Sequence, residues 1–144
     1  MEFQRLWRQL LEELAVPGTA VLVEGERDRR SIERLGVRSP IHLVHRGQPL
    51  SHLAHDLARK TARLIVLTDW DRAGGQFAQK VRELLAAGPV EVDLEFRRRL
   101  ARALRGEVVH VEGMAGWARR LAEREGQPLE RLWDPDAGTR PPTG

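Results

Sequence analysis

The 144-residue chain contains no cysteine, no tyrosine and no asparagine, and lysine occurs only at Lys60 and Lys80. Without cysteine, neither a disulfide framework nor a thiolate zinc site can form, and this composition favours a reducing, cytoplasmic environment. No apolar run approaches the roughly 20 residues that a bilayer-spanning helix needs. The first residues show no basic region followed by an apolar stretch. We therefore expect neither a membrane partner nor a signal peptide.

Arginine makes up almost all of the 24 basic residues, and the chain has a formal net charge of +3 and a sequence pI near 10.4. The planar guanidinium group suits phosphate, and a basic chain is typical of proteins that bind nucleic acid. A GC-rich coding sequence would produce the same bias, so the composition alone leaves both interpretations open. The length predicts one domain.

Short apolar runs alternate with helical patterns along the chain. Strands are predicted from short apolar runs and, at residues 90–93, from an alternating pattern. The predicted strands are residues 20–23, 41–44, 64–67, 90–93 and 108–111. Between them, apolar residues recur at spacings of three and four, as in amphipathic helices, and the first such pattern covers residues 2–15. This alternation predicts an α/β fold with a mostly parallel sheet of four to five strands between helical layers.

Acidic residues follow two of the predicted strands directly. Glu24 follows the first strand, and Asp69 and Asp71 follow the third in the stretch "LTDWDRAGG". Ligands of parallel α/β sheets bind beyond the carboxyl ends of the strands, so we expect the three carboxylates to converge. Their mutual repulsion would be relieved by a divalent cation, and oxygen ligands favour Mg²⁺, with Mn²⁺ as the alternative.

Glycines beside these acids predict a phosphate-binding site. Gly25 leaves room for a close approach, and the helix that follows it directs free N–H groups towards the same edge of the sheet. Gly74 opens the helix after the acidic pair, and Arg72 is placed either to bind a phosphate or to neutralise the acids. Asp28, in the first turn of the earlier helix, is interpreted as complementing the helix dipole.

The stretch "VLVEGERD", followed about 45 residues later by "LTDWDRAGG", resembles the Toprim domain, the catalytic module shared by topoisomerases, bacterial primases, certain nucleases and recombination proteins. The resemblance covers residues 19–113. It implies a general acid/base role for Glu24 and magnesium binding by Asp69 and Asp71, with Glu24 completing the metal-binding group. The chain is also similar to small stand-alone Toprim proteins of archaea and bacteria and, more distantly, to the ribonuclease that matures small ribosomal RNA.

The absent residue types narrow what this resemblance implies. Without tyrosine the chain cannot form the covalent DNA link of topoisomerases, and without cysteine it has no zinc ribbon of the kind used by replicative primases. The remaining expectation is Mg²⁺-dependent phosphodiester chemistry on RNA or DNA, by a nuclease, an RNA-processing enzyme or a nucleotidyl transferase.

Two alternatives stay open. The first is a non-catalytic nucleic-acid-binding or adaptor module of a larger nucleic-acid-processing complex, with the helix at 2–15 as its docking surface. The second is an enzyme that acts on a nucleotide or a small phosphate ester. In each case residues 1–133 are expected to form a single domain, and residues 134–144 a flexible tail.

Arg98, Arg102 and Arg105 share one face of the helix predicted over residues 94–105. Like charges at this spacing destabilise a helix, and a polyanion would relieve them. We therefore predict that this face binds a nucleic-acid backbone, with an ordinary solvated surface as an equal alternative.

Other polar and aromatic residues are assigned structural roles. Trp70 lies between the two aspartates and is expected to pack under its loop rather than stack on a base. His52 and His55 lie three residues apart on a predicted helix and are interpreted as solvated rather than metal-binding.

Overall fold

The computed structural model of the chain describes residues 2–44 and 49–137. Its sheet has four parallel strands in the order β2-β1-β3-β4. The helices and strands, in chain order, are α1 (Glu2–Leu14), β1 (Thr19–Val23), α2 (Glu26–Arg34), β2 (Ile41–Leu43), α3 (Leu50–Leu57), β3 (Arg63–Val66), α4 (Arg72–Leu85), β4 (Glu91–Asp93), α5 (Glu95–Ala103) and α6 (Met114–Arg124). Two short 3₁₀ helices, η1 (Val111–Gly113) and η2 (Leu129–Leu132), flank α6. The predicted α/β fold is confirmed.

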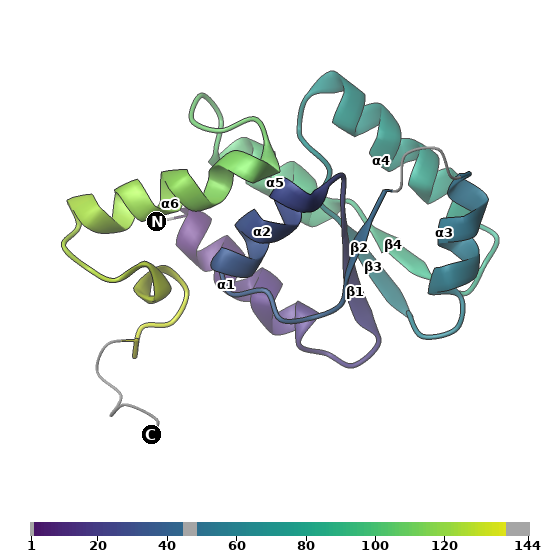
Figure 1. Ribbon diagram of the computed structural model, residues 1–144, viewed down its shortest axis with the longest axis horizontal. Helices are drawn as coiled ribbons and strands as arrows, with labels where there is room; N and C mark the ends of the chain where they lie inside the picture. The colour runs from purple at the N-terminus through teal and green to yellow at the C-terminus, as the bar shows by residue number, and fades with distance from the viewer. Residues whose placement is uncertain (1, 45–48, 138–144) are drawn as a thin grey trace.

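Alternate residues of the central strands face two separate cores. Val21 and Ile65 pack with α1, α2, α5 and α6, whereas Leu22 and Val66 pack with α3 and α4. Figure 1 shows the same division, with α3 and α4 on one side of the sheet and the other four helices on the opposite side. Because β1 and β3 are covered on both faces, their sequences are continuous apolar runs. The two strands that the acidic residues follow are thus the buried centre of the sheet.

Helix α1 belongs to the core. Phe3, Leu6, Trp7 and Leu10 on its apolar face are at most 3% exposed. The indole N–H of Trp7 donates a hydrogen bond of 2.7 Å to the carbonyl of Leu35. The alternative in which this helix offers its apolar face to a partner protein is therefore wrong, because that face is already buried within the chain.

The strand predicted at residues 108–111 is not formed. Val108 and Val111 are buried while Val109 and His110 between them are exposed, so burial does not alternate with the period of two that a half-buried strand requires. The backbone instead crosses the carboxyl end of β3. There the N–H of Trp70 donates to the carbonyl of Val109 at 3.3 Å, and its indole N–H to that of Val108 at 2.6 Å. These contacts hold the segment as a loop that leads into η1.

The chain after α6 packs back onto the helical layer. Leu132 is fully buried, and the carbonyl of Trp133 accepts a 3.1 Å hydrogen bond from Arg8 Nε. Within residues 134–137 the N–H of Ala137 donates to the carbonyl of Asp134. The rest of the predicted tail, residues 138–144, lies outside the described residues. Among the described helices, none is both long and apolar enough to cross a lipid bilayer.

Candidate metal and active site

The carboxyl ends of β1 and β3 bring Glu24 and Asp69 together although they are far apart in the sequence. The two strands are parallel neighbours, with Leu22 opposite Val66, so the residues that follow them emerge side by side. The N–H of Asp69 donates a 2.9 Å hydrogen bond to Oε2 of Glu24. The topology of the sheet therefore produces the predicted contact between the two acidic motifs.

The carboxylate of Asp69 is held by the loop that follows α5. Its Oδ1 accepts a 2.7 Å hydrogen bond from the N–H of Val111, and its Oδ2 lies 3.2 Å from Nδ1 of His110. Oδ2 of Asp71 lies 3.7 Å from the same imidazole nitrogen. The other oxygen of Asp71 accepts a 2.7 Å hydrogen bond from the N–H of Gly74, which makes Asp71 the N-cap of α4.

The acidic residues form two overlapping groups that share Asp69. One group consists of Glu24, Asp28 and Asp69, and the other of Asp69, Asp71 and His110. Within each group the potential ligand atoms lie within 4.8 Å of one another. The sequence predicted one cluster of Glu24, Asp69 and Asp71, whereas in the structure Glu24 and Asp71 belong to different groups. Each group reaches three members through a residue that the prediction left out, Asp28 in one and His110 in the other.

The acidic groups perturb one another's protonation. Burial raises the pKa of Glu24. The hydrogen bond from the N–H of Asp69 lowers this pKa, and the charge of Asp69 raises it again. Burial and the charge of Asp69 likewise raise the pKa of Asp28. The pKa of the His110 imidazole is raised, first by its hydrogen bond to Asp69 and then by the charges of Asp69 and Asp71. Burial is the largest cause of the first two shifts, but neighbouring negative charge contributes to all three, and a bound cation would relieve that charge.

Arg97 supplies part of the missing positive charge. Its Nε donates to the carbonyl and to Oγ1 of Thr68, each at 3.1 Å, and its Nη2 donates to the carbonyl of Asp69 at 2.6 Å. The guanidinium thus fixes the backbone of the turn after β3 while leaving the carboxylates of Asp69 and Asp71 unblocked. Burial lowers the pKa of Arg97, and the nearby acids oppose this shift.

Gly74 is required because the backbone packs against it. A Cβ built on Gly74 would lie 1.8 Å from the carbonyl oxygen of Asp69, a distance that no side chain can occupy. Oγ1 of Thr68 donates a 2.7 Å hydrogen bond to the carbonyl of Gly74 and closes the turn. The N–H of Gly74 already donates to Asp71, as the N–H of Gly25 donates to Oδ2 of Asp28 at 3.0 Å. The structure gives both glycines a role in shaping the acidic turns, and their phosphate-binding role stays a prediction.

The predicted basic contacts lie on the surface. Arg72 is exposed at the start of α4. Arg98, Arg102 and Arg105 are exposed along and just beyond α5, where Arg98 lies 3.5 Å from Glu95. Their binding of phosphate or nucleic acid stays a prediction. Trp70 has its indole bonded to the loop carbonyl of Val108 and packs against the larger core, as expected of a structural residue.

Sequence reasoning missed three residues of the site. Asp28 was interpreted as a residue that complements the helix dipole. It lies three residues after Gly25, and an acidic side chain at this spacing can also accept a hydrogen bond from the backbone at the start of the helix, as Asp28 does. Arg97 is one of three consecutive arginines, and only its place next to the buried Phe96 distinguishes it. His110 was assigned to a strand, so its approach to Asp69 could not be anticipated.

Comparison with known proteins agrees with this geometry. The sequence profile of the Toprim domain matches residues 19–113. The chain is similar to a UPF0292 protein of Methanosarcina acetivorans, with 30% identity over 125 residues that cover 85% of this chain and 86% of that protein. It is 36% identical over 108 residues to a UPF0292 protein of Thermococcus gammatolerans, covering 75% of this chain and 80% of that one.

A solved structure of a protein from Aquifex aeolicus superposes with a TM-score of 0.62 at 25% sequence identity. The superposition covers 74% of this chain and 93% of that protein. The match to the domain profile extends over more than half of the sequence and includes both acidic motifs, at the ends of β1 and β3. The chain therefore belongs to the Toprim domain family.

Proposed function

We propose that the chain carries out magnesium-dependent phosphodiester chemistry on nucleic acid, of the nuclease or RNA-processing type. The observation that carries this proposal is the convergence of Glu24 and Asp69 from two distant segments, linked by a 2.9 Å hydrogen bond, with Asp71 beside them. The same site lies in a chain rich in arginine, which suits a polyanionic substrate. Membership of the Toprim family supports a metal-dependent, nucleic-acid-related role.

The chemistry of the side chains fits a divalent metal ion. Glu24, Asp28 and Asp69 offer only carboxylate oxygens, the ligands that Mg²⁺ prefers. The group of Asp69, Asp71 and His110 combines carboxylate oxygens with one imidazole nitrogen, and this set of ligands is better suited to Mn²⁺. When bound, such an ion polarises a phosphoryl oxygen and stabilises the charge that develops on it.

The protein residues position the reacting groups. Asp69 is fixed by Val111 on one side and through its backbone by Arg97 on the other, so its carboxylate cannot rotate freely. Glu24 accepts the Asp69 N–H through Oε2, which orients its carboxylate beside Asp69. In the proposed reaction this carboxylate serves as the general acid or base, as the family resemblance implies.

The test is a turnover assay on single- and double-stranded RNA and DNA, with Mg²⁺, Mn²⁺ or EDTA. We expect metal-dependent product from the wild type, and a loss of at least about 100-fold in Glu24→Gln and in Asp69→Asn, the range typical of removing an acid/base group. Asparagine can still accept the Val111 N–H through Oδ1, so Asp69→Asn should keep the local fold. The matched control is Glu83→Gln on α4, an exposed position on which the proposed reaction does not depend.

Full activity in Asp69→Asn would overturn the proposal. Tight binding of an oligonucleotide, with no turnover of any of the four substrates under any metal condition, would replace it with the non-catalytic adaptor role. Circular dichroism of each variant, recorded beside the wild type, shows whether a loss of activity reflects unfolding.

A further inference from the structure

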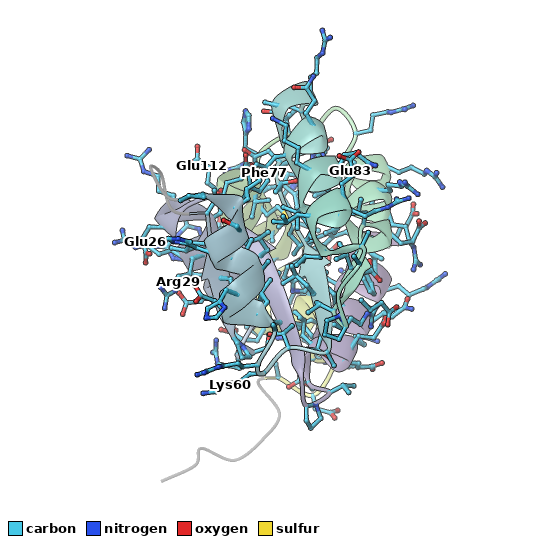
Figure 2. The ribbon with its side chains drawn as sticks, turned by 90° about the vertical axis from the view of Figure 1, so that its right-hand side faces the viewer. Glu26, Arg29, Lys60, Phe77, Glu83 and Glu112 are labelled. Atoms are coloured by element: carbon cyan, nitrogen blue, oxygen red, sulfur yellow. The ribbon has the colours of Figure 1, made fainter. Side chains whose placement is uncertain are left out.

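A groove of about 540 Å³ lies between α2 and α6, next to the acidic site. Four arginines line it, three from α2 and one from α6, against a single acidic residue: Arg27, Arg30, Arg34, Arg120 and Glu112. Glu112 directly follows Val111, whose N–H donates to Asp69, so this end of the groove opens beside the proposed metal ligands. Figure 2 shows Glu112 in the upper part of the molecule, on the same side as Glu26 at the start of α2, and Lys60 near the bottom.

The arginines of α2 are arranged at a cost to the helix. Arg27, Arg30 and Arg34 follow one another at spacings of three and four, so their charges repel along one side of α2. Arg27 also lies in the first turn, where the helix dipole disfavours positive charge. The repulsion along this row and the position of Arg27 are explained if an external anion neutralises the arginines.

The acidic residues of α2 do not neutralise this row. Arg29, on another side of the helix, lies 3.6 Å from Glu26 and 3.7 Å from Glu33. Arg30 reaches Glu26 only at 4.0 Å. For Arg27, Arg34 and Arg120, no carboxylate of the described residues lies within ion-pair distance. Three of the four groove arginines are therefore free to bind an anion.

A hydrogen bond ties together the two helices at the floor of the groove. Ser31 is buried, and its Oγ accepts a 3.1 Å hydrogen bond from the N–H of Ala115, which ties α2 to α6. Gly116 also lies on the floor and has no side chain to fill it. A rigid groove loses little entropy when it binds a ligand, which favours binding.

The length of the arginine row matches a short stretch of nucleic-acid backbone. Arg27 and Arg34 are seven residues apart, which is roughly 10 Å along a helix axis. One strand carries a phosphate about every 3.4 Å along a duplex axis, and at wider spacing when it is extended, so the row faces about two or three of them. The guanidinium fork binds phosphate oxygens in pairs and is suited to such contacts.

We infer that the α2–α6 groove binds the phosphodiester backbone of a nucleic acid and leads the strand to Glu24 and Asp69. This inference deepens the proposed function. It rests on that function only for the statement that the groove leads the strand to the acidic site, and the binding test does not depend on turnover. It also shifts the main contact surface from the predicted α5 arginines to α2 and α6.

The test compares two triple variants that remove the same charge. In the groove variant Arg27→Gln, Arg34→Gln and Arg120→Gln are combined, and in the control Arg5→Gln, Arg59→Gln and Arg82→Gln, three arginines outside the groove. Binding of fluorescein-labelled 12-nucleotide single-stranded RNA and DNA is followed by fluorescence anisotropy in EDTA over a series of salt concentrations. All six side chains are exposed, so both variants should remain folded.

We expect the groove variant to lose at least about tenfold in affinity at low salt. The slope of log K against log salt should decrease by about 2, from about 0.7 for each of three lost phosphate contacts on a single strand. The control should change affinity by less than about threefold. Equal losses in both variants, or a larger loss in the control, would overturn the inference.

Poly-L-glutamate as a competitor separates nucleic acid from an acidic protein partner. Displacement of the labelled oligonucleotide at equal charge concentration would assign the groove to an acidic protein and overturn the inference, whereas weak competition supports it. The proposed function is judged separately from turnover. Groove-dependent binding without turnover refutes only the enzyme, and turnover with unchanged binding in the groove variant refutes only the groove.

Discussion

The two ends of the parallel sheet differ in chemistry. At the carboxyl end, α2 and α4 begin, and their first N–H groups hold the carboxylates of Asp28 and Asp71. At the amino end, α1 and α3 terminate beside a cavity of about 750 Å³ whose lining is largely apolar and includes Leu14, Pro17 and His42. Figure 2 shows Lys60 at this end, far from Glu112. Helix polarity explains the difference, because helix starts offer donors for anionic groups and helix ends do not.

This contrast implies a division of roles. Substitutions at the carboxyl end should change metal binding and turnover, and those at the amino end should change stability alone. The following predictions test that division, beginning with the largest expected effect.

Gly74→Ala should have the largest effect. The added Cβ would overlap the carbonyl of Asp69, so the turn after β3 must move, at a cost of about 3 kcal/mol of unfolding free energy. Because the same turn carries Asp69 and Asp71, metal binding should be lost with it. Chemical denaturation and isothermal titration with Mg²⁺ measure the two effects.

Gly75→Ala is the matched control for this change. A Cβ there would lie 3.4 Å from Nη2 of Arg97, close to an ordinary van der Waals distance, and alanine favours the helix. Its stability should stay within about 1 kcal/mol of the wild type. A Gly74→Ala protein as stable as Gly75→Ala would show that the turn is not held as tightly as its contacts indicate.

The second prediction concerns the two ligand groups that share Asp69. His110→Ala should weaken Mn²⁺ binding by about tenfold and Mg²⁺ binding much less, since imidazole is a ligand for transition metals and a poor one for magnesium. Titration of each metal, with His55→Ala on α3 as an exposed control, measures the ratio. Equal losses for both ions would mean that His110 acts by orienting Asp69 rather than as a ligand.

The smallest effect is expected at the amino end. Burial lowers the pKa of His42 below its usual 6.5, although the charge of Asp56 opposes the shift. The folded state therefore binds fewer protons than the unfolded state just below pH 6.5. The contribution of neutral His42 to the stability of the folded state is therefore fully present above pH 6.5 and is lost as the pH falls through the folded-state pKa of His42.

His42→Gln should consequently flatten the dependence of Tm on pH in the range just below 6.5, without altering turnover. His55→Gln, at an exposed position on α3, is the matched control. A change in turnover with His42→Gln would break the division between the two ends of the sheet.

The sequence predicted the parts of the fold that follow from local periodicity. Continuous apolar runs such as Leu64–Leu67 identify strands that are buried on both faces, and the order of strands and helices then requires parallel pairing. The contact of Glu24 with Asp69 follows from that topology alone. These inferences need no knowledge of side-chain packing.

The parts that failed depend on tertiary contacts. Residues 108–111 contain three valines, which favour a strand, yet Trp70 bonds to their carbonyls and keeps them as a loop. His110 and Arg97 reach the acidic turn from segments whose own sequences carry no sign of it. Their roles arise only when α5 and the loop after it dock on the carboxyl end of β3.

The position of Asp69 has a consequence for folding. Its backbone and carboxylate are bonded to Glu24, Arg97 and Val111, from three segments that are distant in the sequence. Contacts of such long range form late, after local helices and turns. A nascent chain that does not yet include residue 111 therefore lacks the N–H that holds the Asp69 carboxylate, and the acidic centre is completed only when the segment after α5 has docked.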